Sequence, residues 1–510
     1  MHKFSKNVDM PVRNTYRTII RNMALIAGSS IATTLFLIAR NKAVALILGP
    51  SGVGLIGLLQ SLMAWGSALA ALGLGTVGAR GVAQSNISKP ERGAVDVHRM
   101  LSVSLIVSGL LGWGAVLLFR GQLAQFILGD RSLGNSLGWV GLGVFATAAA
   151  GAHSAYLRGL KRVSDQAKST LIAGVLATAI GIIVIYTLGE NGIIPFVIVV
   201  PLLNYLTLMW FARRVRAERN LQISTDEMRK EWAKAWRPGL VFMVTGSLVA
   251  GGHLLLRSLI KYQSGVNELG MFQAAWMVTI AYIGFVITAM SNDYYPRLSE
   301  AIEAKWNIVE LVNQQMELVL LISTPIIVIM IAISPSLISI LYSSEFFPAE
   351  GLLRWQLLGD VFKILSWPLG MIFLANGDSK SYLQNEVLQS VLFVVLAIFG
   401  LYAIGILGVS IGYAATFPIY YLMVQRRAKR SIGFEMSTKV RTSAVFLVVT
   451  ALLTFLICEF SRTAGLLTGV SIGVLLAIRS FGLIWRLGQF NGIVGSAGQL
   501  CSTLMSRVGL

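Results

Sequence analysis

Apolar segments long enough to cross a membrane recur along almost the whole chain, from Arg21 to Trp485. About 20 such residues span the ~30 Å hydrocarbon core as one helix, because a bilayer offers no partners for unpaired backbone groups. Apolar residues make up 55% of the chain and charged residues 13%, well below the roughly 25% charged residues of soluble proteins. The sequence therefore predicts an all-α polytopic membrane protein without a soluble domain.

Fourteen transmembrane helices (TM1 to TM14) are expected at this spacing. The first apolar run, 23–48, is too long for the core of a signal peptide and lacks a convincing cleavage site, so we interpret it as a retained helix. The expected spans lie near residues 20–48, 53–79, 99–120, 136–157, 169–189, 192–212, 238–262, 268–292, 316–342, 351–375, 382–403, 407–425, 441–458 and 464–485.

Lysine and arginine are distributed unevenly between the two ends of these spans. An even number of spans puts both termini on one side. Of the 42 Lys and Arg residues, 33 then fall on that side, eight on the other, and Lys363 lies inside a span. Positive residues favour the cytoplasm, so both termini are expected there. The predicted organisation is a tail (1–19), an N-lobe of TM1 to TM6 (20–212), a basic linker (213–237), a C-lobe of TM7 to TM12 (238–425), a cytoplasmic loop (426–440), TM13 and TM14 (441–485) and a second tail (486–510).

The two lobes show an internal repeat with an offset of about 216 residues. It places "GLIGLLQSLMAW" from Gly54 on "GMFQAAWMVTIA" from Gly270, and "HRMLSVSLIVSG" from His98 on "QQMELVLLISTP" from Gln314. Each lobe would then hold six spans in the same orientation, related by a pseudo-twofold axis near the membrane normal. This layout occurs in transporters that rock around a central site.

Several chemistries find no support in the sequence. The net charge of +19 resides in short loops between apolar runs, which indicates a topology signal and no nucleic-acid surface. The two cysteines, Cys458 and Cys501, have no metal-ligand spacing, and neither an HExxH nor a GxSxG motif occurs. We therefore expect no metal site, no cofactor and no enzyme activity.

A glycine motif near the first apolar run, Gly52-x-Gly54-x-x-Gly57, has the spacing of a dinucleotide-binding loop. Such a loop must follow a buried strand in a soluble unit, and the flanks here are membrane spans. We expect Gly49 and Pro50 to end TM1, because glycine tolerates a left-handed cap and proline cannot continue a helix. The later glycines would allow a tight outer turn and close packing of TM2.

These features together resemble the polysaccharide transporter family, the O-antigen type flippases of the multidrug/oligosaccharidyl-lipid/polysaccharide exporter superfamily. The stretch "ARNKAVALILGPSGVGLIGLLQS", the following "GLGTVGARGVAQ" and the echo "NELGMFQAAWM" carry the resemblance, which covers roughly residues 17 to 427. It implies the two-lobed fold of this superfamily in a bacterial inner membrane. TM13 and TM14 lie outside the twelve-span core that many such proteins have.

Charged residues inside the spans are the candidate functional residues, since buried charge is costly in a bilayer. Arg40 and Lys42 fall in the outer part of TM1, and Arg257 and Lys261 fall in the corresponding zone of TM7. They either snorkel to the outer headgroups or line a cleft that holds an anion. Arg80, at the inner end of TM2, is either a topology anchor or a contact for the entering anion.

The resemblance implies what that anion is: the diphosphate of an undecaprenyl-linked oligosaccharide, such as an O-antigen repeat unit, moved from the inner to the outer leaflet by alternating access. Arginine binds phosphate bidentately and lysine acts as a point charge. Lys42 matches a basic position of similar flippases, and Arg257 is its approximate counterpart in the repeat. Membrane lipids, a polysaccharide polymerase and a chain-length regulator are the expected partners in lipopolysaccharide biosynthesis.

Three further charged residues of the second lobe are candidates. Asp360 and Lys363 in TM10 are three residues apart and share a helix face. They form either a structural ion pair or a site with a protonatable carboxylate and a substrate-binding lysine, because related transporters are driven by proton or sodium gradients. Asp293 closes TM8 and is either an inner-surface charge or a second ion-coupling group.

Alternatives within and beyond this fold differ in the charges and loops they need. A lipid II flippase fits the same features. An exporter of small cationic molecules would need acidic residues where this chain has basic ones. A membrane polymerase or ligase would need large outer loops with catalytic side chains, and a scaffold would gain nothing from buried charges.

Overall fold

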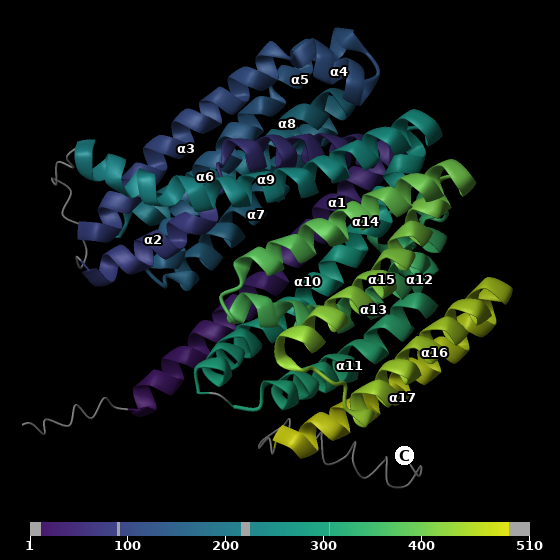
Figure 1. The fold of residues 1–510 in the computed structure, drawn as a ribbon. Coiled ribbons are helices and arrows are strands. Elements are labelled where there is room, and N and C mark those ends of the chain that lie inside the picture. Colours follow the sequence, from purple (N-terminus) through teal and green to yellow (C-terminus); the bar gives the residue numbers. More distant parts are fainter. Residues whose placement is uncertain (1–11, 89–91, 216–224, 305, 489–510) are drawn as a thin grey trace, which may run out of the picture. The chain divides into compact units, whose positions relative to one another are not determined.

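The computed structural model describes residues 12–88, 92–215, 225–304 and 306–488. Every regular element in these ranges is a helix, which confirms the expected all-α class (Figure 1). Parts of the expected tails and linker, namely 1–11, 216–224 and 489–510, lie outside the described residues.

Eleven helical stretches of the described chain are long and apolar enough to span a membrane, as expected for a multi-pass membrane protein. Two of them, Leu35–Ala70 and Val163–Arg213, contain 36 and 51 residues, which exceeds the ~20 residues of one crossing. The eleven stretches therefore do not equal the number of crossings, and fourteen crossings stay a prediction.

The chain divides into two compact units, Met1–Ile47 with Leu58–Gly251 (unit 1) and Leu48–Gly57 with Gly252–Leu510 (unit 2). Unit 1 holds most of α1 (Val12–Ala70), then α2 (Leu74–Ser88), α3 (Arg92–Leu118), α4 (Arg120–Leu128), η1 (Arg131–Leu133), α5 (Gly134–Gly138), α6 (Val140–Gly159), α7 (Val163–Leu188), η2 (Gly189–Gly192), α8 (Ile193–Arg213) and the first part of α9 (Thr225–Ser264). Unit 2 holds the rest of α9, then α10 (Val266–Glu303), α11 (Ile308–Ala332), α12 (Ser334–Leu341), η3 (Ser344–Phe346), α13 (Ala349–Ala375), α14 (Ser379–Ile404), α15 (Ile406–Ile432), α16 (Thr438–Phe460) and α17 (Arg462–Gly488).

Each unit shows the same order of helix packing. In unit 1, α6 contacts α2, α3 and α8, and α8 also contacts α7. In unit 2, α13 contacts α10, α11 and α15, and α15 also contacts α14. The offset of about 216 residues pairs these helices in this order, so the repeat is confirmed at the level of helix packing. Helices α16 and α17, which have no counterpart in unit 1, both pack on α11.

Helix α1 bends at Gly49, which has a φ of 63° and a non-helical ψ (Figure 1). Glycine adopts this conformation without strain, and Pro50 follows it, as expected for the end of TM1. The expected tight turn over Gly52, Gly54 and Gly57 is wrong, since all three lie inside the helical arm after the bend. The expected packing role is right, because a Cβ on Gly54 would lie 2.6 Å from the carbonyl oxygen of Val266.

The same close approach makes Gly270→Ala a destabilising change. Its Cβ would lie 1.9 Å from the carbonyl oxygen of Pro50, which is backbone and cannot rotate away. Overpacking of this kind costs about 1–3 kcal/mol, so we expect a lower Tm of the purified protein. Gly284→Ala on the same helix is the matched control, since open space surrounds that position and alanine is the better helix former. An equal Tm for both variants would contradict the close contact.

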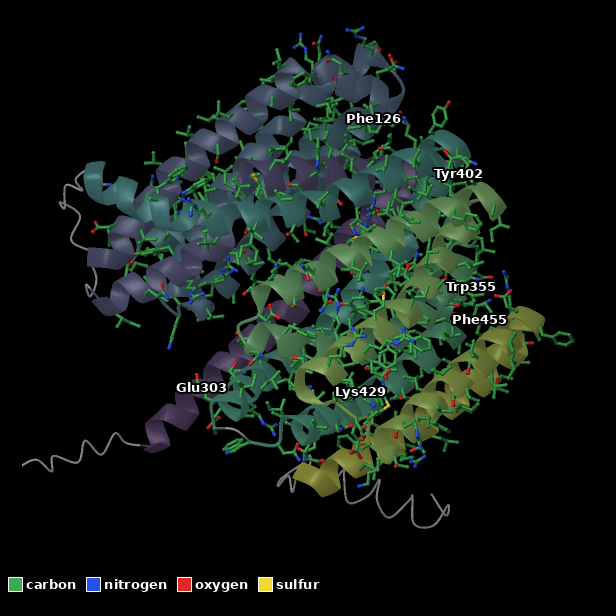
Figure 2. The ribbon with its side chains drawn as sticks, in the orientation of Figure 1. Phe126, Glu303, Trp355, Tyr402, Lys429 and Phe455 are labelled. Atoms are coloured by element: carbon green, nitrogen blue, oxygen red, sulfur yellow. The ribbon has the colours of Figure 1, made fainter. Side chains whose placement is uncertain are left out.

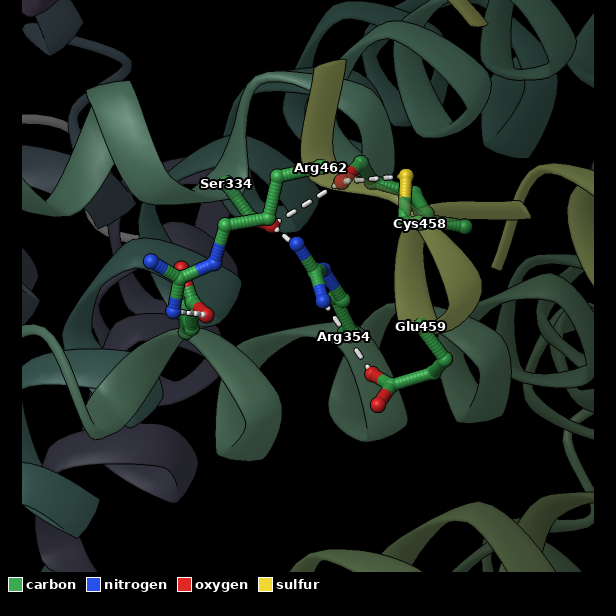
Figure 3. A network of polar contacts seen from close by, with 7 residues as sticks. Ser334, Arg354, Cys458, Glu459 and Arg462 are labelled. Carbon is green, nitrogen blue, oxygen red and sulfur yellow. Dashed lines mark hydrogen bonds and ion pairs between the residues drawn. The ribbon is translucent and has the colours of Figure 1, made fainter. Parts of the chain in front are cut away.

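The terminal helix pair is attached to α13 by polar and aromatic contacts. Arg354 donates from Nη1 to Oε1 of Glu459 at 3.1 Å and from Nε to Oγ of Ser334 at 2.9 Å (Figure 3). Phe455 of α16 packs edge-on against Trp355 of α13 with ring centroids 4.9 Å apart (Figure 2). These contacts explain how two helices outside the repeat form part of unit 2.

Removing the carboxylate from this network should loosen the attachment. Arg354 is only 3% exposed, so Glu459→Ala leaves a buried guanidinium with Ser334 as its remaining side-chain partner. A hydrogen bond to a charged group contributes about 1.5–3 kcal/mol, and we expect the Tm to fall accordingly. Asp165→Ala, which breaks the exposed pair with Arg162, is expected to change stability by less than about 0.5 kcal/mol. An equal or smaller effect of Glu459→Ala would contradict the assigned role.

Candidate functional site

Asp360 of α13 is fully buried and binds two tyrosines from neighbouring helices of unit 2. Its Oδ2 accepts a hydrogen bond from the hydroxyl of Tyr282 on α10 at 2.8 Å, and its Oδ1 accepts one from the hydroxyl of Tyr413 on α15 at 2.6 Å. Because one carboxyl group connects three helices through hydrogen bonds, a change in its charge alters the interactions among all three.

Lys363 lies one turn further along α13 and reaches Asp360 through Tyr413. Its ammonium donates to the Tyr413 hydroxyl at 3.0 Å and lies 5.2 Å from the centre of the Phe417 ring. The described residues show no direct ion pair between Asp360 and Lys363. The two residues therefore share a helix face, as their spacing predicts, but a tyrosine hydroxyl separates their charges.

The polar face of α13 continues one turn before Asp360. Gln356 is fully buried, accepts a hydrogen bond from Thr279 at 3.0 Å and donates one to Ser410 at 3.2 Å. Residues four apart lie above one another on a helix, so Gln356 and Asp360 form one polar stripe inside an apolar unit.

Arg257 of α9 is buried without a carboxylate partner. Its Nε donates to Oε1 of Gln273 at 3.1 Å, and its Nη1 donates to the backbone oxygen of His253 at 3.4 Å. The guanidinium also lies 5.6 Å from the centre of the Trp276 ring. The side chain is 5% exposed, whereas a snorkelling arginine extends its head group into water. All its partners in the described chain are neutral, so its positive charge is not balanced.

An aromatic cluster connects Arg257 to the residues around Asp360. Trp276 stacks on Phe393 with ring centroids 5.6 Å apart, and it lies edge-on to Tyr413 at 5.5 Å. His253 contacts both Trp276 and Phe393. Three of the predicted site residues of unit 2, Arg257, Asp360 and Lys363, are thus brought together around one cluster.

In unit 1, Arg40 repeats the pattern of an unbalanced buried arginine. It is 8% exposed, its Nε has no hydrogen-bond partner among the described residues, and its guanidinium lies 5.5 Å from the centre of the Phe196 ring. Arg40 of α1 and Arg257 of α9 lie 217 residues apart, within about one residue of the repeat offset. Both are therefore buried cations at corresponding places in their units.

The remaining predicted residues are less enclosed. Lys42 and Lys261 are half-buried, and each has interactions with neighbouring groups. Arg80 on α2 is exposed, as a topology anchor would be. The backbone of Asp293 lies in α10, but its side chain lies outside the described residues. The described chain shows no group of three or more His, Cys, Asp or Glu residues that could hold a metal ion.

Sequence reasoning missed the partners of these charges. Tyr413 and Gln273 carry no motif, and only their places on neighbouring helices reveal their roles. A second missed feature is a histidine pair in unit 1, in which Nε2 of His98 and Nδ1 of His153 lie 2.9 Å apart and Tyr156 stacks on His98. The sequence separates the two histidines by 55 residues, so no spacing pattern could show the pair.

Comparisons with known proteins give a matching family model, a sequence relative and solved structures with a similar fold. A family model described as "Polysaccharide biosynthesis protein" matches residues 43–350. The lipid III flippase of Escherichia coli is 25% identical over 392 residues, which cover 74% of this chain and 91% of that protein. An inward-facing multidrug resistance MATE family transporter of the MOP superfamily aligns with a TM-score of 0.63, 19% identity and coverage of 78% and 95%. The lipid II flippase MurJ in an inward closed conformation aligns with a TM-score of 0.62, 13% identity and coverage of 92% and 99%.

Proposed function

The chain belongs to the polysaccharide biosynthesis protein family, and from this premise we propose that it is a flippase for a lipid-linked glycan. The specific substrate we propose is an undecaprenyl-diphosphate-linked oligosaccharide, an O-antigen or related repeat unit, moved from the inner to the outer leaflet of the bacterial inner membrane. The similarity to the lipid III flippase over 91% of that protein supports the substrate class. No covalent step is needed.

The observation that carries the proposal is the pair of buried arginines without carboxylate partners. A buried charge is costly unless a partner neutralises it, and Arg257 has only neutral partners in the described chain. A diphosphate supplies the missing negative charge, and a guanidinium binds it bidentately. We propose that Arg257, Arg40, Lys42, Lys261 and Lys363 bind the head group while the lipid tail stays in the membrane, and that Arg80 meets it at the inner end.

Asp360 is the proposed ion-coupling group. Its carboxyl group is enclosed by Tyr282, Tyr413 and the nearby ammonium of Lys363. Binding of a proton or sodium ion there would change the charge balance of the unit and bias it between two packings. Asp293 stays a second candidate, and no other cofactor is proposed.

The distribution of Lys and Arg between the loops supports the proposed orientation of the chain in the membrane. Both termini are proposed to lie in the cytoplasm, so that the head group enters at the inner leaflet, where lipid-linked sugars are assembled. We propose that the two lobes alternate between inward and outward access around the bound head group. A polysaccharide polymerase and a chain-length regulator are the proposed protein partners downstream.

Lipid II transport is the alternative within this fold, because MurJ aligns over 92% of this chain. Export of a small organic cation is disfavoured, since the buried charges Arg40 and Arg257 would repel it. A glycan polymerase or ligase is the alternative from a different class, since it would act on the same lipid-linked sugars.

Complementation tests the proposal. Wild-type protein should restore surface polysaccharide in a bacterium that lacks its O-antigen flippase, and Lys42→Ala and Arg257→Ala should fail to do so at matched membrane levels. Arg430→Ala removes an exposed charge of α15 and should complement normally. Full activity of the Lys42 and Arg257 variants would overturn their assigned roles. If the wild type does not restore surface polysaccharide but rescues a deletion of a lipid II or lipid III flippase, the substrate is that lipid instead.

A further inference from the structure

Two neighbouring cavities in unit 2 lie along helices α13, α15 and α16 and share two lining residues; the joined space is the volume of both. One has a volume of about 250 Å³ and the other of about 710 Å³, and Phe362 and Val448 line both. Neither cavity is lined by Asp360, Lys363 or Arg257. The joined space is therefore separate from the polar cluster assigned to the transported head group.

The smaller cavity is apolar throughout. Leu358 and Val361 of α13, Ile411 and Ala414 of α15, and Leu452 of α16 are among its lining residues, and none of the lining side chains is charged. Along α15 the lining residues run from Ile411 at the apolar end to Arg426 at the basic end, where Lys429 also lies. The fifteen helical residues from Ile411 to Arg426 extend ~22 Å, which is about half of the ~40–45 Å bilayer with its head groups. The space is as deep as one leaflet.

The larger cavity is basic at its opposite end. Arg426 and Lys429 from the end of α15 and Arg441 from the start of α16 line it, together with one carboxylate, Glu435. Lys429 and Glu435 lie 3.4 Å apart, but both side chains are largely exposed, so this pair is weak. Arg426 and Arg441 form no ion pair with any described residue. This end of the cavity (Lys429 is labelled in Figure 2) therefore carries two unbalanced positive charges.

We propose that this joined space binds a resident anionic glycerophospholipid between the repeat and the terminal helix pair. Its phosphate contacts Arg426 and Arg441, and one acyl chain passes Phe362 and Val448 into the apolar cavity. Basic pockets between transmembrane helices are the usual sites for anionic lipid head groups. A soluble phosphate would leave the apolar end empty, and a zwitterionic lipid would bring a cation that cancels the charge of its phosphate beside the two arginines.

The position of the lipid explains a gap in the protein's own packing. Arg354 and Phe455 contacts attach helix α16 to α13 near the apolar cavity. Near the basic end, the larger cavity is lined by residues of α13, α15 and α16. The lipid fills this space and completes the attachment of α16.

The test uses the full chain in detergent. Increasing amounts of phosphatidylglycerol, or of zwitterionic phosphatidylcholine as the neutral comparison, are added while the Tm is followed, and bound lipids are identified by native mass spectrometry. We expect phosphatidylglycerol to raise the Tm by several degrees, phosphatidylcholine to raise it much less, and one phosphatidylglycerol to stay bound. The Arg426→Gln/Arg441→Gln double variant should need at least tenfold more phosphatidylglycerol for the same shift.

Two further variants separate the charge from the cavity. Arg430→Gln, on the same helix but outside the lining residues, should respond like the wild type. Val448→Trp fills the neck between the cavities and should lose the bound lipid; if it does not fold, the arginine variant still decides. An unchanged phosphatidylglycerol response in the double variant, equal effects of both lipids, or binding of undecaprenyl diphosphate in place of phosphatidylglycerol would each overturn the proposal.

Discussion

Arg257→Met is expected to abolish transport while the fold becomes no less stable. Truncating a buried, hydrogen-bonded charge at a binding site costs about 2–5 kcal/mol of binding free energy, which corresponds to a loss of transport of about 30-fold or more. The free energy of unfolding should not fall, because the described chain gives Arg257 no carboxylate partner. Replacing an uncompensated buried charge by an apolar side chain of similar volume is neutral or stabilising.

A loss of transport without a loss of stability distinguishes a ligand-binding arginine from a structural one. Transport is measured as surface polysaccharide in the complementation assay, and stability as the Tm of the purified variant. Arg354→Met is the matched comparison, since Arg354 is equally buried but pairs with Glu459. It should lower the Tm. A large fall in the Tm for Arg257→Met, with transport preserved in the remaining folded protein, would assign Arg257 to the structure alone.

Asp360→Asn is expected to remove the response of transport to an ion gradient. Asparagine keeps the shape and can still accept from Tyr282 or Tyr413, but it can neither take up a proton nor balance the charge of Lys363. We expect the transport rate to fall at least tenfold, to the level that the wild type shows when ionophores collapse the proton and sodium gradients. The rate is followed in vesicles with and without an imposed gradient.

Asp378→Asn supplies the control for this change. Asp378 caps α14 by accepting a hydrogen bond from the backbone of Ser381 at 3.0 Å, and its hydrogen bonds with Ser381 lower the pKa of this exposed carboxyl group. The control variant loses the same charge away from the cluster and should keep its gradient response. If Asp360→Asn keeps it as well, Asp360 is structural.

The class of fold could be predicted because it depends on local composition. A run of 20 apolar residues must be a helix in a bilayer wherever it lies in the chain, and the repeat is visible because packing positions recur at one offset. The bend at Gly49 was predictable for the same reason, since glycine followed by proline restricts the backbone locally.

The partners of the charges could not be predicted, because they depend on tertiary packing. The spacing of Asp360 and Lys363 places them on one helix face, yet only the packing of α15 on α13 puts the Tyr413 hydroxyl between them. The turn expected at Gly52 to Gly57 was wrong because glycine spacing does not distinguish a turn from a close helix contact. The residues of α10 that these glycines contact lie more than 200 positions further along the chain.

The most direct test of the central claim is transport by the purified wild-type protein in proteoliposomes. A fluorescent undecaprenyl-diphosphate-linked oligosaccharide is placed in both leaflets, and the fraction that a membrane-impermeant reagent modifies is followed over time. The account predicts that nearly all of the labelled lipid becomes accessible, whereas about half does in protein-free liposomes and in liposomes with Arg257→Met. Accessibility equal to that of protein-free liposomes, with folded protein present and a gradient imposed, would contradict the assignment of this chain as a flippase for such lipids.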